Sequence, residues 1–232
     1  MIKHVIEGSV IICGILLSLY IGELNTQKNN IEIKKELIQD LNRSLNDDLE
    51  QIKIIQNILE NSLNQISKLQ DDIESNHQNL SDQEAINLIL DIEVAASFFP
   101  SIGVYNELIS SGSYELVNNS ELKRTLIDLY ETQKERNYTM SLSLDNLALQ
   151  YVRETLEKFN IRFTYNISEG EVYGDRVIQN YKFDQKYYSS KEFYGLLSTL
   201  SYPANNYNRL LITAKKSIEG AKKLIIIEIS DT

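Results

Sequence analysis

Apolar and polar positions separate most sharply at the start of the chain. The segment Gly8–Gly22 contains fifteen residues without a charge, rich in Val, Ile and Leu, and the sequence then becomes charged and amide-rich. A membrane-spanning helix needs about 20 apolar residues. The stretch 2–24 has that length if it accommodates Lys3 near one end and Glu7 inside. The pattern predicts a membrane anchor over residues 1–25 that leads into a long water-exposed helix.

A cleaved signal peptide is the main alternative, because its apolar region is also short. Cleavage before Glu23 would place Tyr20 and Gly22 in the usual small-x-small site, and Tyr20 is too large. A lipoprotein site at Cys13 fails because Ile12 stands where a small residue is needed. We therefore expect an uncleaved signal anchor. Flanking basic residues do not decide the orientation; a cytoplasmic N-terminus with the bulk of the chain on the other side of the membrane is the simpler topology.

A helical repeat of apolar residues follows the anchor. Its mean spacing is about 3.56 residues, between the values for coiled coils and for straight helices. Neither Pro nor Gly occurs between Glu23 and Phe99, so we predict one helix to about Glu74. The stripe packs either on helices of the same chain, which we favour, or in a parallel coiled coil between chains. It consists of Leu41, Leu45, Leu49, Ile52, Ile55, Leu59, Leu63, Ile66, Leu69 and Ile73.

Capping residues and helix breakers place the next elements. Ser81 and Glu84 form a capping box for a helix that would reach about Phe98, before a proline. A short helix over 104–111 should end at Gly112, whose permissive φ suits a C-cap.

The second half of the chain is also mainly helical. Asn119 or Ser120 should cap a helix over 121–159, whose polar middle at 133–137 predicts a kink or an uncovered section. Two further helices are expected, over Ser190 to Leu200 and from Pro203 to about Ile229.

Residues 160–190 are the least regular. A small β-hairpin near 161–173 is one alternative, with a turn at 168–171, because apolar residues alternate at Ile161, Phe163, Tyr165 and Ile167. Eight of the fourteen tyrosines fall between residues 165 and 207, which favours aromatic packing over a ligand platform. The predicted fold is all-α, an antiparallel helical bundle over residues 26–232 with this hairpin as an option.

Composition and motifs exclude several functions. The net charge of −10 argues against nucleic-acid binding. His4 and His77 are far apart, and GxSxG, Walker and HExxH motifs are absent from the sequence. We therefore expect no enzyme, with no catalytic residue, metal or cofactor. The adjacent pairs Asp47–Asp48 and Asp71–Asp72 are interpreted as solvated surface.

Glu7 is the charged residue whose location is hardest to accommodate. A carboxylate one turn inside an apolar run is unfavourable unless it is protonated, paired or at the interface. Its side chain either reaches the headgroup layer or pairs with a basic group on a partner's membrane helix. Glu7 is therefore the candidate site residue, as a partner contact in the membrane.

The chain contains the segments EGSVIICGILLSLYIGELN and YNELISSGSYELVNNSELKRTLIDLYE. Together they resemble a family of bacterial envelope proteins of unknown function with one anchor and a helical domain. In EGSVIICGILLSLYIGELN the similar residues are Glu7, Gly14, Ile15, Leu16, Leu19, Ile21 and Asn25, although a tryptophan typical of that family is missing. In YNELISSGSYELVNNSELKRTLIDLYE they are Tyr105, Leu108, Ser111, Gly112, Leu116, Asn119, Leu122, Leu126 and Tyr130. The resemblance implies this architecture and a location in the bacterial inner membrane, with the bulk of the chain in the periplasm, but no activity.

The sequence thus favours a membrane-anchored helical scaffold or interaction protein, with the lipid bilayer and a protein partner or a second copy as its partners. The alternative is a ligand-binding sensor subunit that signals through a partner membrane protein. An interaction protein should expose an apolar or Tyr-rich strip, whereas a sensor should enclose a pocket between helices.

Overall fold

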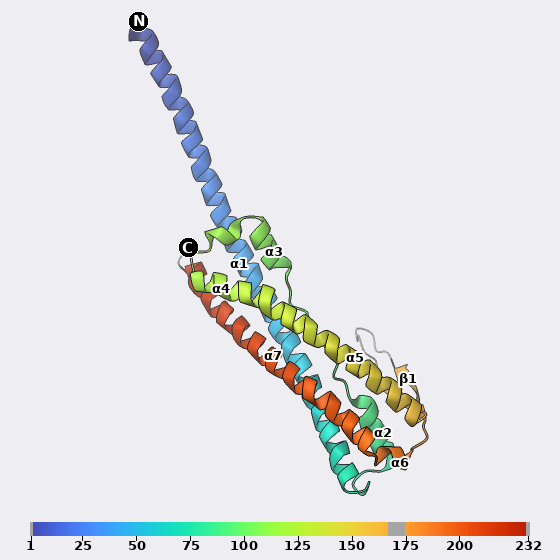
Figure 1. Cartoon of the computed structure of the whole chain (residues 1–232). Coiled ribbons are helices and arrows are strands. Elements are labelled where there is room, and N and C mark those ends of the chain that lie inside the picture. The colour runs from blue at the N-terminus through green and yellow to red at the C-terminus, as the bar shows by residue number, and fades with distance from the viewer. Residues whose placement is uncertain (1, 167–174, 231–232) are drawn as a thin grey trace. The chain divides into compact units, whose positions relative to one another are not determined.

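The computed structural model describes the backbone of residues 2–166 and 175–230, and the side chains of residues 11–165 and 176–230. Within these residues the chain is mostly helical, with one two-stranded sheet (Figure 1). The elements are α1 (Ile2–Glu74), α2 (Asp82–Asp91), α3 (Gly103–Ser110), the 3-10 turn η1 (Ser113–Leu116), α4 (Ser120–Ile127), the π-helical turn η2 (Asp128–Gln133), α5 (Lys134–Lys158), β1 (Arg162–Asn166), β2 (Asp175–Asn180), α6 (Gln185–Tyr188) and α7 (Lys191–Ser230).

The chain forms two compact units. The first unit comprises Met1–Asp47, Ser101–Tyr130 and Ile218–Thr232, and the second comprises Asp48–Pro100 and Glu131–Ser217. The long helices α1 and α7 contribute to both units. The predicted domains, an anchor over 1–25 and a bundle over 26–232, stay a prediction.

The apolar stripe of α1 is covered by helices of the same chain, as we favoured from the sequence. Its members Leu41, Leu45, Ile52, Ile55, Leu59, Ile66 and Leu69 are buried. In the second unit, Gln56 Nε2 donates to Asn208 Oδ1 at 2.9 Å and Gln70 Nε2 donates to Ser198 Oγ at 2.9 Å. Residue numbers rise along α1 as they fall along α7, so the two helices are antiparallel there.

The first unit is built around a tyrosine stack and two helix ends. The rings of Tyr105 and Tyr130 are buried and stacked, with centroids 4.6 Å apart. Gly112 has φ 74°, the left-handed conformation predicted for it. Asn119 caps α4, since its side chain accepts hydrogen bonds from two backbone N–H groups of the first turn.

One predicted helix is too long. The capping box of Ser81 and Glu84 is present, but α2 ends at Asp91 and not near Phe98. The chain then runs without helix or strand to Ile102. Burial in this extended segment alternates, with Ile92, Val94, Ala96 and Phe98 inside. Period-two burial fits an extended backbone and not a helix, which is why the helix stops.

Side chains of three helices satisfy the backbone of this extended segment. Tyr207 Oη accepts from Phe98 N at 2.8 Å, and Asn137 Nδ2 donates to Phe98 O at 2.6 Å. Ser62 Oγ donates to Glu93 O at 2.9 Å and accepts from Glu93 N at 2.8 Å. A buried extended segment that is not paired in a β-sheet needs such partners, because backbone groups without a hydrogen bond are unfavourable in a core.

The helix predicted over 121–159 is interrupted. The π-helical turn η2 separates α4 from α5, at the start of the polar stretch 133–137 where a kink was expected.

The last two predicted helices, over Ser190 to Leu200 and from Pro203 to about Ile229, form the single helix α7. Pro203 lies inside α7, whose flanking residues Leu200 and Ala204 are buried. Continuous packing on both sides outweighs the hydrogen bond that a proline removes.

The hairpin is present, so the fold is mostly α and not all-α. Strands β1 and β2 pair antiparallel, with an irregularity between Arg162 and Phe163. The second strand begins at Asp175, beyond the expected limit of 173, and the predicted turn at 168–171 lies outside the described residues. The tyrosine-rich region contributes to packing, with Tyr187, Tyr188 and Tyr207 buried.

Replacing Tyr207 by Phe should destabilise the protein by about 1–3 kcal/mol, because the buried N–H of Phe98 loses its acceptor. Denaturant unfolding of the full chain in detergent, followed by circular dichroism, measures this difference. Tyr202→Phe is the control, since that ring is exposed. Equal midpoints for the two variants would contradict the role given to the Tyr207 hydroxyl.

Candidate functional site

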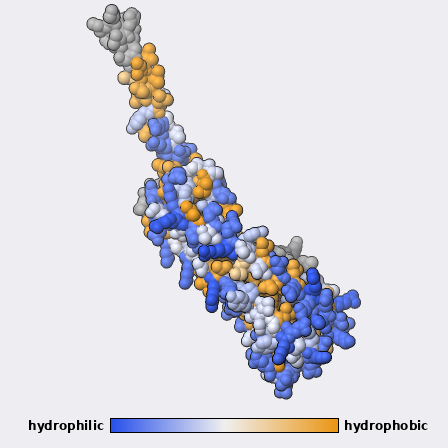
Figure 2. All heavy atoms as spheres, viewed as in Figure 1, coloured by the Kyte–Doolittle hydropathy of each residue, from blue (hydrophilic) through white to orange (hydrophobic). Residues whose placement is uncertain are grey.

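The N-terminal part of α1 carries apolar side chains that the chain leaves uncovered. Three consecutive residues, Ile15, Leu16 and Leu17, are 56%, 60% and 60% exposed. Successive helical residues point about 100° apart, so the apolar surface surrounds the helix. Figure 2 shows this orange segment followed by hydrophilic blue side chains. A helix that is apolar on all sides is normally buried, in a protein core or in a membrane.

Within the part of the chain that the structure describes, no helix is long and apolar enough to cross a membrane. The side chain of Glu7, the candidate partner contact, lies outside the described residues.

A buried ion pair joins α1 to α7 in the first unit. Lys34 Nζ donates to Glu228 Oε1 of α7 at 2.9 Å, and both side chains are almost fully buried. The Glu228 carboxylate also accepts from Asn118 N at 3.0 Å and Asn119 N at 2.8 Å, at the start of α4. Burial raises the pKa of Glu228, but the backbone of Asn118, Lys34 and the backbone of Asn119 outweigh burial and hold this pKa below its usual value. The cluster ties three helices together.

A second buried carboxylate organises the turn between α1 and α2 in the second unit. Asp72 is fully buried and accepts from Tyr188 Oη at 2.7 Å and from the N–H groups of Asn79 and Leu80 at 2.8 and 3.0 Å. Its pKa is raised by burial but lowered more by hydrogen bonds, the largest of which is with His77, so the net shift is downward.

His77 bridges Asp72 to a second carboxylate. Its Nδ1 lies 2.6 Å from Asp72 Oδ2 and its Nε2 lies 2.9 Å from Asp82 Oδ1. The imidazole is stacked on Phe183 with centroids 4.9 Å apart. Burial lowers the pKa of His77, but the hydrogen bonds with Asp72 and Asp82 outweigh burial and raise it. With both nitrogens engaged, this ring is not placed to act as a general base.

The prediction that both aspartate pairs are solvated is wrong for one member of each pair. Asp47 and Asp71 are exposed, but Asp48 and Asp72 are buried. The sequence does contain a signal: Asp48 lies seven residues before Ile55, and Asp72 lies three residues after Leu69, so both are in phase with the buried stripe. Among the described residues, no group of His, Cys, Asp or Glu is arranged to hold a metal ion.

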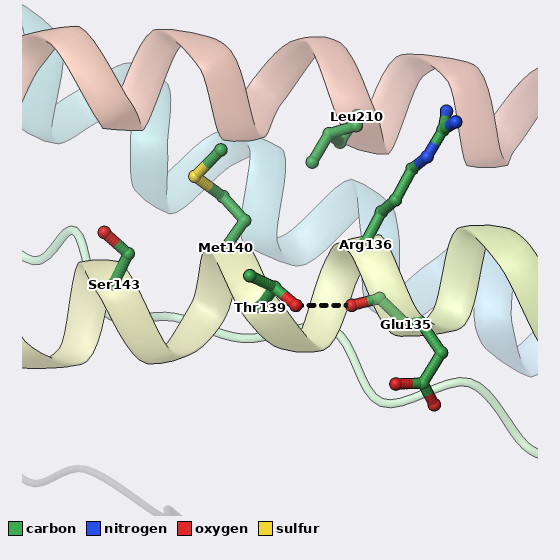
Figure 3. Close-up of a pocket in the computed structure, with 6 residues that line it drawn as sticks. All are labelled: Glu135, Arg136, Thr139, Met140, Ser143 and Leu210. Atoms are coloured by element: carbon green, nitrogen blue, oxygen red, sulfur yellow. Dashed lines mark hydrogen bonds between the residues drawn. The ribbon is translucent and has the colours of Figure 1, made fainter.

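An open groove of about 580 Å³ lies between α5 and α7 in the second unit (Figure 3). Met140 and Leu210 form its apolar wall, while Arg136 extends towards α7 and the carboxylate of Glu135 points away. Thr139 Oγ1 donates to the carbonyl of Glu135 at 3.0 Å. The groove is open at the surface, so it lacks the enclosure expected of a sensor pocket.

One flank of α5 carries an exposed apolar strip. Leu149 and Tyr138 are 68% and 56% exposed, and Leu142 and Val152 are also exposed. Their spacing of four, seven and three residues places them along one line of the helix. The core side of α5 is separate and contains Leu144 and Tyr151, among others. We name these four residues the α5 strip: Tyr138, Leu142, Leu149 and Val152.

Comparison with known proteins gives one match. The chain matches the model of a family of unknown function, DUF6090, over residues 7–183. No curated protein and no solved structure matches. The match includes the predicted contact residue Glu7, the Tyr105–Tyr130 stack and the α5 strip. It covers well over half of the chain, which therefore belongs to this family, DUF6090.

Proposed function

We propose that this protein is a membrane-tethered helical interaction module. The uncovered apolar surface around residues 11–24 of α1 supports a tether, because water is an unfavourable environment for such a surface. In the sequence this run extends back to Ile2, which gives a length compatible with a bilayer. The tether is an uncleaved anchor in a bacterial inner membrane, with a cytoplasmic N-terminus and a periplasmic bundle.

The α5 strip is the observation that favours interaction over ligand sensing. It offers apolar side chains outside the core, as expected of a surface that a second protein covers. The groove between α5 and α7 is open at the surface and does not enclose a ligand, which gives a ligand-binding sensor less support. The partner is another membrane-associated helical protein or a second copy of this chain.

Glu7 adds a contact within the anchor. In a helix, Gly14 and Ser18 lie seven and eleven residues further along the same face as Glu7. Small residues allow a neighbouring helix to approach closely. A carboxylate on that face is best accommodated by a basic group of the partner helix, while headgroup contact is the alternative.

Wild-type protein should remain in the membrane pellet after alkaline carbonate washing. Leu16→Arg combined with Leu19→Arg should release it, because each Arg adds about 3 kcal/mol to the insertion free energy near the middle of a span. Asn29→Arg combined with Asn30→Arg adds the same charge beyond the apolar run and should leave the protein in the pellet. Carbonate-soluble wild-type protein would contradict the tether.

Introducing two carboxylates into the α5 strip should strongly weaken partner binding. Leu142→Asp with Leu149→Asp should lower partner recovery after mild solubilisation at least tenfold, because burying each Leu contributes about 1.5–3 kcal/mol. The control Asn146→Asp with Gln150→Asp adds equal charge at exposed positions of the same helix. Quantitative mass spectrometry and chemical cross-linking measure recovery and self-association. Unchanged recovery with the strip variant would exclude the strip as the binding surface.

The variant Glu7→Gln distinguishes an ion pair with a basic residue of the partner from contact with the lipid headgroups. If Glu7 pairs with a basic residue of the partner, the uncompensated partner charge should weaken the complex by about 3–5 kcal/mol while insertion persists. Blue native electrophoresis in mild detergent measures the complex, and Glu23→Gln serves as the control. If the Glu7→Gln variant recovers every partner at the same yield as the wild-type protein, the Glu7 carboxylate lies among the lipid headgroups instead.

A further inference from the structure

The His77 imidazole lies between a carboxylate near the end of α1 and a carboxylate at the start of α2. A protonated imidazole donates from both nitrogens, so it can satisfy Asp72 and Asp82 together. A neutral imidazole has a single N–H and presents a lone pair at the other nitrogen. Ionised carboxylates only accept, so the neutral ring can keep one of the two contacts and must face repulsion at the other.

We propose that Asp72, His77 and Asp82 form a pH-sensitive latch that holds the start of α2 on the end of α1 and releases it when His77 loses its proton. Asp72 keeps its contact, since it is buried and Tyr188 and two backbone N–H groups hold it in place. Asp82 is the first residue of α2 and its side chain is 56% exposed, so it can turn to water. The contact that is released is that of Asp82, at the first residue of α2.

The pH range follows from the groups that face His77. They are Asp72 from α1, Asp82 from α2 and the Tyr188 phenol from α6, with the uncharged Phe183 ring on one face. Burial lowers the pKa of His77, but the two carboxylates outweigh burial and raise this pKa above its ordinary value of 6.5. The latch is therefore fully closed below pH 6.5 and opens as the pH rises through the higher value of the folded protein.

Histidine ring NMR and amide hydrogen exchange test the latch on the full chain in detergent micelles. The sequence has two histidines, so the His77 signal is assigned by comparison with His4→Gln. We expect His77 to titrate above 6.5, and Asp82→Asn to lower its midpoint. Above that midpoint, exchange protection at the start of α2 should fall roughly tenfold, after correction for the intrinsic pH dependence of exchange.

Asp82→Asn is the matched control for the conformational step. A side-chain amide both donates and accepts, so it can pair with His77 Nε2 in either protonation state. Protection of α2 in this variant should therefore be independent of pH over the same range. Because Asp82 is exposed, this variant should fold as the wild type does.

Three results would overturn the proposal. The first is a His77 midpoint at or below 6.5 in the wild-type protein. The second is the same fall in α2 protection in wild type and Asp82→Asn, which would assign the response to another group. The third is a His77→Gln chain in which the pH dependence of α2 protection is unchanged.

Discussion

The antiparallel packing of α7 on α1 is the interaction on which both units depend. The apolar stripe of α1 is too long to be left in water, and α7 supplies a complementary apolar side with Leu211, Ile218 and Ile225 buried. Polar pairs fix the alignment within each unit, such as Gln56 with Asn208 and Lys34 with Glu228. Apolar burial provides the stabilisation and these directional contacts select one register.

Periodicity predicted the parts of the fold that repeat. A stripe with helical spacing identifies α1 because the same burial recurs at every turn, and the cap of Ser81 and the left-handed Gly112 depend on local chemistry alone. The extended segment after α2 was missed because its alternation covers only four buried positions. The continuity of α7 through Pro203 was missed because tertiary packing overrides a local helix breaker.

Buried carboxylates mark a second limit of sequence interpretation. Asp71 and Asp72 are neighbours with the same chemistry, and their environments differ because a helix turns about 100° per residue. The partners of Asp72 come from the following turn and from α6, more than a hundred residues away. Such a site depends on tertiary structure. The position of Asp72 in phase with the apolar stripe indicates that it is buried, but it does not identify its hydrogen-bond partners.

The predicted contact Glu7 and the α5 strip differ in what sequence can reveal about them. Glu7 stands out because a charge interrupts an apolar run, a signal that is local. The α5 strip cannot be recognised in the sequence, because Leu142 and Leu149 have the helical spacing that core residues also have. Only their exposure in the structure distinguishes them from the buried Leu144 and Tyr151. Packing of the core accounts for one side of α5, and the exposed apolar residues on its second side are the observation that supports the proposal of a protein partner.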